Sequence, residues 1–248
     1  MSNTPKDWDE HVAEAEELAR TPGFQRLRDR ILELSQAGQD DVVADIGAGT
    51  GLLTLALAPS VSKVWAVDIA PSMLEYLATK AASAELENVE TTTATAASLP
   101  LVDGSVSLLV SNYCYHHLSD EDKAKAVAEA FRVLAPGGRL VISDMMFRVQ
   151  VSDERSRQVI TAKVRAMLAR GPAGVWRLLK NALRILLRRW EQPADSGWWR
   201  GALRQAGFEH VEVELMEHEG GIVSARRPVG PEAGRGALRR RGRARAAA

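Results

Sequence analysis

A glycine-rich turn between two apolar stretches constrains this chain more than any other feature. Residues 41–54 read DVVADIGAGTGLLT, with glycine at Gly47, Gly49 and Gly51. The apolar run before the glycines predicts a buried strand, and the Leu- and Ala-rich stretch after them predicts a helix. Glycine permits positive φ and removes the Cβ that would keep a ligand away. The first turn of a helix has unpaired N–H groups, so we expect a polar ligand to dock at this turn.

The acid before the turn narrows the class of ligand. A dinucleotide fingerprint requires a third glycine where this chain has Leu52. Asp45 ends the predicted strand, and a carboxylate there would repel a pyrophosphate but suits a ligand with positive charge. S-adenosylmethionine (SAM) carries a sulfonium and an α-ammonium group. The pattern D-x-G-x-G-x-G, which includes Ala48, resembles motif I of the class I SAM-dependent methyltransferases. A structural turn that holds no ligand is the alternative.

A second strand-end acid matches the same family. Asp68 ends the run KVWAV and lies 17 residues beyond Gly51, about where a doubly wound fold places the acceptor for ribose hydroxyls. Residues 68–74, DIAPSML, resemble the family signature D-x-[ST]-x-x-M-L. The resemblance implies that Ile69 and Met73 flank the adenine of the cofactor. Ordinary filling of the core is the alternative for Met73.

The loop after the third predicted strand departs from the family pattern. Residues 95–105, TAASLPLVDGS, resemble the family's G-D-A-x-x-L-P-[FL]-x-D-[GN]-S loop, but Thr95 replaces the acid that usually bonds the adenine amino group. A hydrogen bond without charge assistance is about half as strong. We therefore expect either a modest affinity for the nucleotide or an adenine held mainly by the backbone of Ala96 and Ala97.

The order of the predicted elements indicates the fold class. Strands and helices alternate from Asp41 to Asp144, and the stretch RVLAPGGRLVISD at 132–144 resembles another hallmark of the family. Such alternation predicts a parallel sheet covered on both faces. We expect an α/β fold, a doubly wound, Rossmann-like, mostly parallel sheet of seven strands. The expected regions are an N-terminal helical lid or packing pair (1–37), the SAM-binding core (38–146), a helical insertion (147–194), a closing helix and strands (195–226) and a disordered basic tail (227–248).

Candidate catalytic residues follow the fourth predicted strand. Ligands of open α/β sheets bind beyond the carboxyl ends of the strands, so residues 112–117 are expected near the transferred methyl group. A histidine there can act as a general base near neutral pH. The candidates are His117, His116 and Tyr115, and Asn112 is expected to contact the cofactor. Alignment of the acceptor with the methyl carbon accounts for most of the expected catalysis.

Composition limits the other chemistries. Cys114 is the single cysteine, and the chain has no H-E-x-x-H motif, so we expect neither an internal disulfide nor a metal site. Residues 1–11 have no apolar core, which argues against a secretory signal. No run of 18 apolar residues predicts a membrane span. We expect a cytoplasmic protein, with peripheral contact at the inner membrane face as an alternative.

The insertion is the most individual part of the sequence. Residues 174–190 combine a narrow basic stripe with a wide apolar face that ends in tryptophans. A lid or a homodimer surface is the favoured interpretation, and an interfacial membrane helix is the alternative. Both interpretations imply an apolar or aromatic small-molecule acceptor, methylated on oxygen, nitrogen or carbon. The two rivals are a SAM-binding regulatory or partner subunit without catalysis and, less favoured, an RNA or DNA methyltransferase that uses the basic insertion and tail.

Overall fold

The short apolar runs of the sequence form one central sheet. The computed structural model describes residues 8–147, 192–216 and 219–230, together with isolated positions between 157 and 176. The strands are β1 (Val42–Ile46), β2 (Lys63–Asp68), β3 (Val89–Thr93), β4 (Val106–Asn112), β5 (Leu134–Met145), β6 (Glu209–Leu215) and β7 (Gly220–Arg226). Their order is β3-β2-β1-β4-β5-β7-β6, and β7 runs antiparallel to both of its neighbours. The predicted doubly wound, mostly parallel, seven-stranded sheet is confirmed.

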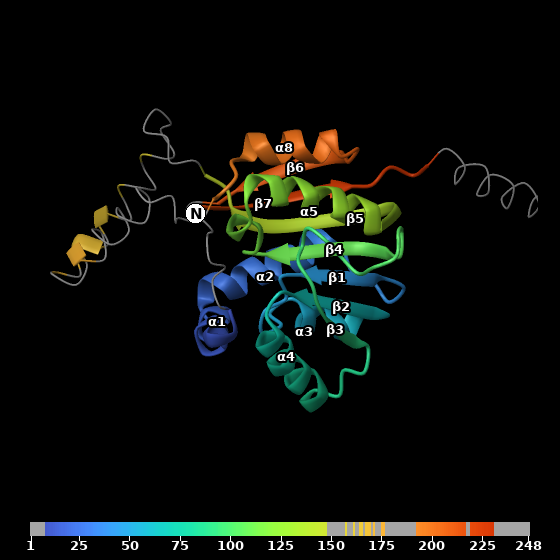
Figure 1. The fold of residues 1–248 in the computed structure, drawn as a ribbon, viewed down its shortest axis with the longest axis horizontal. Helices are drawn as coiled ribbons and strands as arrows, with labels where there is room; N and C mark the ends of the chain where they lie inside the picture. Colours follow the sequence, from blue (N-terminus) through green and yellow to red (C-terminus); the bar gives the residue numbers. More distant parts are fainter. Residues whose placement is uncertain are drawn as a thin grey trace, which may run out of the picture.

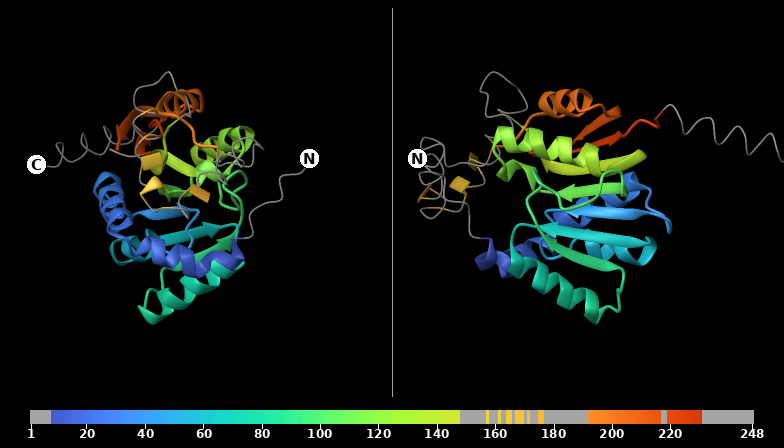
Figure 2. Two further views of the ribbon diagram at one scale, coloured as in Figure 1. Left: turned by 90° about the vertical axis from the view of Figure 1, so that its left-hand side faces the viewer. Right: turned by 45° about the vertical axis from the view of Figure 1, so that its right-hand side comes forward.

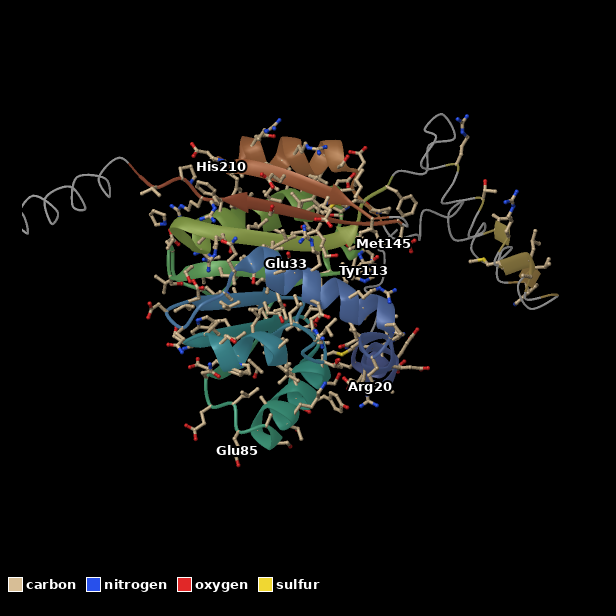
Figure 3. The ribbon with its side chains drawn as sticks, turned by 180° about the vertical axis from the view of Figure 1, so that it is seen from behind. Arg20, Glu33, Glu85, Tyr113, Met145 and His210 are labelled. Carbon is tan, nitrogen blue, oxygen red and sulfur yellow. The ribbon has the colours of Figure 1, made fainter. Side chains whose placement is uncertain are left out.

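Helices cover both faces of this sheet (Figure 1). One face carries α2 (Pro22–Ser35), α3 (Thr54–Leu57) and α4 (Pro71–Ser83), and the other carries α5 (Asp120–Val133) and α8 (Ser196–Gln205). Seen from behind, α2 crosses the sheet in front of the strands (Figure 3). The remaining helical elements are short: η1 (Asp9–His11), α1 (Val12–Ala19), η2 (Ala58–Ser60) and η3 (Tyr115–His117).

Local sequence sets where the main helices begin. The hydroxyls of Thr21 and Ser119 and the carboxylate of Asp195 each accept a hydrogen bond from an N–H in the first turn of α2, α5 and α8. Such side chains satisfy one of the donors that a helix start leaves unpaired, which stabilises the helix by about 1 kcal/mol. Pro22 and Pro71 occupy the first turn of α2 and α4, where proline costs no hydrogen bond.

Alternate side chains of the strands enter two apolar layers. Val43, Val110 and Val141 pack on the α2 side with Ile31, whereas Leu109 and its neighbours pack on the side of α5 and α8. Successive side chains of a strand point to opposite faces, which explains this division. A fully buried aliphatic side chain contributes about 2 kcal/mol through the area it removes from water. The two layers therefore hold the sheet rigid beneath the loops at its edges.

The helix after the glycine turn is shorter than the sequence predicted. α3 has four residues, and η2 follows it at Ala58–Ser60, with Pro59 in its first turn. Proline cannot donate the hydrogen bond that a longer α-helix would need at that position. A helix of four residues adds little through its dipole, and the docking of a ligand at this turn stays a prediction. The turn itself must provide any binding groups.

The loop between β3 and β4 is fastened to α5. The guanidinium of Arg132 donates to the carbonyl oxygens of Leu99 (2.9 Å) and Leu101 (2.8 Å) and pairs with Asp103 and Glu129. The carboxylate of Glu129 also accepts from the Leu99 N–H at 2.7 Å. These contacts hold the loop that contains Thr95 against the face of the sheet. Within the described residues, no helix has the length and apolarity that crossing a membrane requires.

Two glycines offer a matched test of this backbone. Gly51 has φ +92°, and a Cβ there would lie 2.0 Å from Leu77 Cδ1, whereas Gly201 lies in α8 with nothing within 4 Å of an added Cβ. We expect Gly51→Ala to lower the free energy of unfolding by about 2 kcal/mol or more, because it combines strain with overpacking. Gly201→Ala should raise it by roughly 0.5–1 kcal/mol.

Urea unfolding of both variants and the parent chain measures these changes. A Gly51→Ala protein as stable as the parent would contradict the geometry described for the turn.

Candidate functional site

The glycine turn lies at the carboxyl edge of the sheet and is open on one side. The N–H groups of Gly47 and Ala48 donate to the carbonyl of Val67 at 2.8 and 3.0 Å, which joins the turn to β2. Gly49 has φ +51°, and an added Cβ would meet nothing within 4 Å. The backbone at Gly49 is therefore accessible to a ligand without an intervening side chain.

Asp45 is a buried carboxylate beneath this turn. Its side chain is 1% exposed, and its Oδ2 accepts from Thr54 Oγ1 at 2.6 Å. Burial raises the pKa of Asp45 to about 7, and the charge of Asp68 adds to the rise. In the described part of the chain no ion pair reaches Asp45. Burial of an unpaired carboxylate is costly, so this position favours the binding of a cation.

Asp68 lies at the end of β2 and bonds the turn directly. Its Oδ2 accepts from the Gly49 N–H at 2.8 Å, and its Oδ1 accepts from the Ala70 N–H at 3.0 Å. Burial raises the pKa of Asp68, and these donors oppose the rise. A carboxylate has about four acceptor positions, so it retains capacity for hydroxyl groups of a ligand. The structure thus places Asp68 beside the open turn, as the sequence predicted.

The residues expected around the adenine are only partly accessible. Ile69 is 51% exposed, whereas Met73 is 3% exposed and available mainly for packing. Thr95 is exposed and pairs with Ser98 through the backbone, and Ala96 is 7% exposed within the core cluster. Ala97 is half-buried in the same loop. Ile69 and the 95–97 loop therefore border the same edge, and their contact with adenine stays a prediction.

The end of β4 combines a strained residue with an unpaired amide. Tyr113 has φ +55°, which is uncommon for a residue with a side chain, and its N–H donates to the Ser143 carbonyl at 2.9 Å. Asn112 Oδ1 is buried without a hydrogen-bond partner. Tyr113 and Met145 lie at the same end of the sheet (Figure 3). Backbone strain and an unsatisfied polar atom often occur together at functional sites.

The three predicted catalytic side chains take different positions. His116 is 4% exposed, and its Nδ1 lies 2.5 Å from Asp144 Oδ1. His117 is exposed at the surface of η3, where its ring lies 4.5 Å from that of Trp8. Tyr115 is 1% exposed and packs against Trp199 in the core, with ring centroids 5.3 Å apart. Because its ring points into the core, the structure does not bring Tyr115 to the acceptor side, and we remove it from the catalytic candidates.

The N-terminal segment reaches across the edge that carries these residues. Asp9 in η1 accepts from the Ser72 N–H at 2.9 Å at the start of α4. Lys80 of α4 donates to Glu16 Oε2 at 2.9 Å and to the Thr50 carbonyl at 3.1 Å. Figure 1 and Figure 2 show α1 at the end of the sheet where the strands β1 and β4 finish. Residues 8–20 therefore lie beside both the glycine turn and η3, whereas α2 packs on the sheet face.

Sequence reasoning overlooked Asp144 as a site residue. It is the second-to-last residue of β5, as Asp45 is of β1, and Asp68 is the last residue of β2. The same rule about strand-end acids would have selected it. Trp8 was also missed as a residue of the site, because nothing in the sequence predicts its contact with His117.

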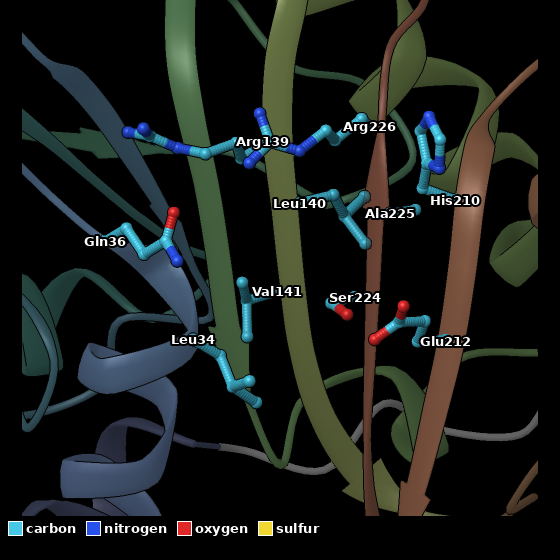
Figure 4. Close-up of a pocket in the computed structure, with 10 residues that line it drawn as sticks. All are labelled: Leu34, Gln36, Arg139, Leu140, Val141, His210, Glu212, Ser224, Ala225 and Arg226. Atoms are coloured by element: carbon cyan, nitrogen blue, oxygen red, sulfur yellow. The ribbon is translucent and has the colours of Figure 1, made fainter.

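A separate hollow lies on the α2 side of the sheet, near the opposite edge (Figure 4). It is lined by the end of α2 and by β5, β7 and β6, with Arg139, Arg226 and Glu212 among its polar side chains. Arg139 also donates to Asp41 Oδ2 at 2.5 Å, before the start of β1. The hollow is thus remote from the glycine turn. Among the described residues, no cluster of three or more His, Cys, Asp or Glu side chains is arranged to hold a metal ion.

Two predicted regions cannot be compared with the structure. The amphipathic stretch 174–190 lies outside the described residues except for Val175 and Trp176, which are exposed. The basic tail from 227 is described only as far as 230. The predicted lid, dimer, membrane and nucleic-acid roles of these segments remain predictions.

Comparison with known proteins gives consistent matches. A family model described as "Methyltransferase domain" matches residues 43–138. The ubiquinone/menaquinone biosynthesis C-methyltransferase UbiE of Vibrio vulnificus is 30% identical over 216 residues, which cover 83% of this chain and 78% of UbiE. The uncharacterized methyltransferase YcgJ of Bacillus subtilis is 36% identical over 114 residues, 46% of this chain and 44% of YcgJ. In YcgJ and two similar matches, the chain spans about half of the relative's length, from 44 to 61%.

A solved structure supports the fold. The phosphoethanolamine N-methyltransferase 2 of Haemonchus contortus, solved with phosphomonomethylethanolamine and S-adenosylhomocysteine, has a TM-score of 0.66. The match covers 89% of this chain and 57% of that one, with 16% identity. At this identity the likeness shows the fold alone.

The raised pKa of Asp45 predicts a pH-dependent stability. The pKa in the folded chain is about 7, above the value of 3.8 expected for an exposed aspartate. The folded state therefore binds the proton more tightly, and stability from this group is lost as pH rises from about 4 to 7. Asp45→Asn should remove that loss. The free energy of unfolding of the variant relative to the parent should therefore increase by a few kcal/mol from about pH 4 to pH 7, on the order of the pKa shift times 1.36 kcal/mol.

Urea unfolding at several pH values measures this difference. Parallel curves for the variant and the parent would show that Asp45 ionises normally.

Proposed function

This chain belongs to the class I SAM-dependent methyltransferases, and we propose on that premise that it transfers a methyl group from SAM to a small, apolar or aromatic acceptor. The 30% identity with UbiE over most of both chains supports family membership. UbiE is named as a C-methyltransferase of quinone biosynthesis, and another relative, from Hahella chejuensis, as a malonyl-[acyl-carrier protein] O-methyltransferase. Both names favour a small acceptor group over a nucleic acid.

One observation supports the proposal most strongly: Asp45 is a buried carboxylate without a cation, directly beneath an open glycine turn. Its raised pKa shows that an ionised Asp45 is unfavourable while no positive charge is near. The α-ammonium and sulfonium groups of SAM supply such a charge. The residues present therefore fit this cofactor.

The proposed roles of the other residues follow from their positions. Asp68 would accept hydrogen bonds from the ribose hydroxyls, and the backbone around Gly47, Ala48, Gly49 and Gly51 would face the amino-acid part. Ile69 and residues 95–97 would border the adenine. Asn112 Oδ1, buried and unpaired, would accept a hydrogen bond from the amino-acid end. SAM supplies an activated methyl group when bound, so the chain's own task is to bind, orient and exclude water.

Residues 8–20 would act as a lid over this site. Trp8 covers His117, and the Glu16–Lys80 pair joins α1 to the carbonyl of Thr50 in the glycine turn. This segment thus contacts η3 directly and the glycine turn through Lys80. Closure by this segment would exclude water from the reacting atoms.

A methylation assay separates this proposal from its rivals. The pure protein is incubated with methyl-labelled SAM and a fractionated cell extract, and labelled products are identified by mass spectrometry. We expect label in small organic-soluble molecules. Tight SAM binding without any product would favour the regulatory subunit, and label in RNA or DNA would favour the nucleic-acid enzyme.

Removal of the ribose acceptor should weaken cofactor binding. We expect Asp68→Ala to reduce the affinity for SAM at least tenfold in calorimetry, because two charge-assisted hydrogen bonds are lost, each worth about 1.5 kcal/mol or more. Asp40→Ala, which removes an exposed acid before β1, should bind SAM like the parent. Equal affinities for the two variants would refute the assigned position of the ribose.

Loss of the aromatic contact should open the lid. We expect Trp8→Ala to increase the dissociation rate of SAM about three- to tenfold, since an aromatic pair contributes about 0.5–1.5 kcal/mol beyond its burial. Leu18→Ala, which shortens an exposed side chain on α1, should leave the rate unchanged. Stopped-flow displacement of labelled SAM measures both rates, and an unchanged rate for Trp8→Ala would remove the lid from the mechanism.

A further inference from the structure

We propose that the hollow on the α2 side of the sheet is a binding site for a small oxyanion, a phosphate or a carboxylate. The hollow lies near the amino ends of the parallel strands, remote from the glycine turn, so its ligand takes no part in the proposed methyl transfer. The residues that line it come from the end of α2 and from β5, β7 and β6 (Figure 4).

Two arginines of this hollow face each other on neighbouring strands. Arg139 of β5 and Arg226 of β7 are cross-strand partners in the antiparallel ladder. Such partners lie on the same face of the sheet with Cβ atoms about 5 Å apart, and like charges at these positions repel. The Arg226 side chain runs over β5 toward Arg139 (Figure 4). An oxyanion bound beside the two guanidinium groups would offset this repulsion.

Acidic side chains neutralise only part of this charge. The carboxylate of Asp41 accepts from Arg139 Nη2 at 2.5 Å. Arg226 takes part in none of the ion pairs of the described residues, although Glu209 is its cross-strand partner on β6. Glu212 also lines the hollow, but it lies at the opposite end from the two arginines (Figure 4). The end of the hollow at Arg226 therefore keeps a positive charge that can bind an anion.

Arg139 also has a donor without an acceptor. Its Nε is buried and has no hydrogen-bond partner in the described part of the chain, although the side chain as a whole is 21% exposed. A buried donor of a charged group is costly to leave unpaired, and native structures contain few of them. Asp41 occupies only Nη2, and a guanidinium has five N–H donors. Arg139 therefore keeps the capacity to bind a second acceptor.

Two residues of the hollow have an uncommon backbone conformation. Gln36 ends α2 with φ +48°, and His210 has φ +52° within the irregular register of β6. Positive φ is uncommon for residues with a side chain, and in the described part of the chain Glu85 and Tyr113 are the other two cases. A bulge on an edge strand re-aims a side chain, and such strain is often retained at binding sites. Gln36 and His210 both line the hollow, and both side chains can donate a hydrogen bond.

The size and the donors of the hollow define the class of ligand. Its volume is about 220 Å³. Pockets for drug-sized molecules have roughly 300–1,000 Å³, so a smaller ligand fits here. Among the described residues that line it, Glu212 is an acid and five can donate a hydrogen bond: Gln36, Arg139, His210, Ser224 and Arg226. Guanidinium groups bind the paired oxygens of carboxylates and phosphates, so the hollow suits inorganic phosphate, a small phosphate ester or a small carboxylic acid.

A bound anion would join the last strands of the sheet to α2. Arg30 of α2 already pairs with Glu214 of β6 at 2.6 Å. An anion that contacts Gln36 on α2 and Arg226 on β7 would add a second link between the same parts of the fold. A ligand that binds only the folded chain raises its stability. Unfolding experiments can therefore detect the site without an assay of methyl transfer.

The first test compares urea unfolding of the full chain in phosphate, malonate and chloride at equal ionic strength. We expect a higher midpoint in phosphate or malonate than in chloride, and we expect Arg226→Gln to lose this increase. Arg204→Gln makes the same chemical change at an exposed site of α8, on the other face of the sheet, and should keep it. Phosphate stabilises folded proteins in general, so the difference between the two variants is the decisive result. Equal increases in both variants would overturn the inference.

The second test measures the affinities for inorganic phosphate and malonate by calorimetry, and the tighter of the two identifies the preferred oxyanion. We expect Arg226→Gln to weaken binding about fivefold or more, because a charge-assisted hydrogen bond is lost. Glu212→Gln should strengthen binding about two- to threefold, because it removes a like charge near the anion. Arg204→Gln should bind like the parent. Absence of binding to the parent at millimolar concentrations, or weaker binding in Glu212→Gln, would overturn the inference.

The third test uses the strained residue of the bulge. His210→Gly should unfold at a higher urea concentration than the parent, because glycine adopts positive φ freely, yet bind the preferred oxyanion about threefold more weakly. Glu85→Gly is the matched control, since Glu85 has φ +55° just after α4, far from the hollow in the chain. It should gain stability and keep the affinity of the parent. An unchanged affinity in His210→Gly would overturn the assignment of the bulge to the site.

Discussion

The contact between Gly47 and Cys114 sets the geometry on which the candidate site depends. A Cβ at Gly47 would lie 2.5 Å from the Cys114 sulfur, and Gly47 has φ +71°. Only glycine therefore lets the turn after β1 approach the segment after β4 so closely. That approach places the groups proposed to hold the methyl donor next to the segment that carries His116. Burial raises the pKa of the Cys114 thiol, which makes it a packing group rather than a nucleophile.

Three acids near the carboxyl ends of β1, β2 and β5 lie in different surroundings. The Asp45 carboxylate accepts hydrogen bonds from Thr54, and burial raises its pKa to about 7. The Asp68 carboxylate accepts hydrogen bonds from two backbone N–H groups and is partly exposed beside the glycine turn. Asp144 meets an imidazole. The cost of burying each charge depends on its partners, so three identical side chains differ in the groups that they can bind.

Much of the fold could be predicted because its signals are local. The seven strands follow from short apolar runs, and the glycine turn with Asp68 follows from motif spacing. The length of α3 was overestimated, because Pro59 outweighed an apolar composition that favours a helix. Tyr115 was placed with the catalytic candidates, although adjacent residues of a 3₁₀ turn point in different directions and its ring enters the core. Periodicity alone does not resolve orientation over three residues.

The sequence by itself determined the order of the strands along the chain, the cofactor class and the acids at the strand ends, since these depend on residues close together in the chain. Only the tertiary structure decided which side chain or backbone group contacts each of those acids. Asp144 and His116 are separated by 28 residues and meet because parallel pairing brings the ends of β4 and β5 to one edge. Trp8 reaches His117 only through the docking of η1 on α4. Contacts between distant segments depend on packing of the whole core, and no local pattern encodes them.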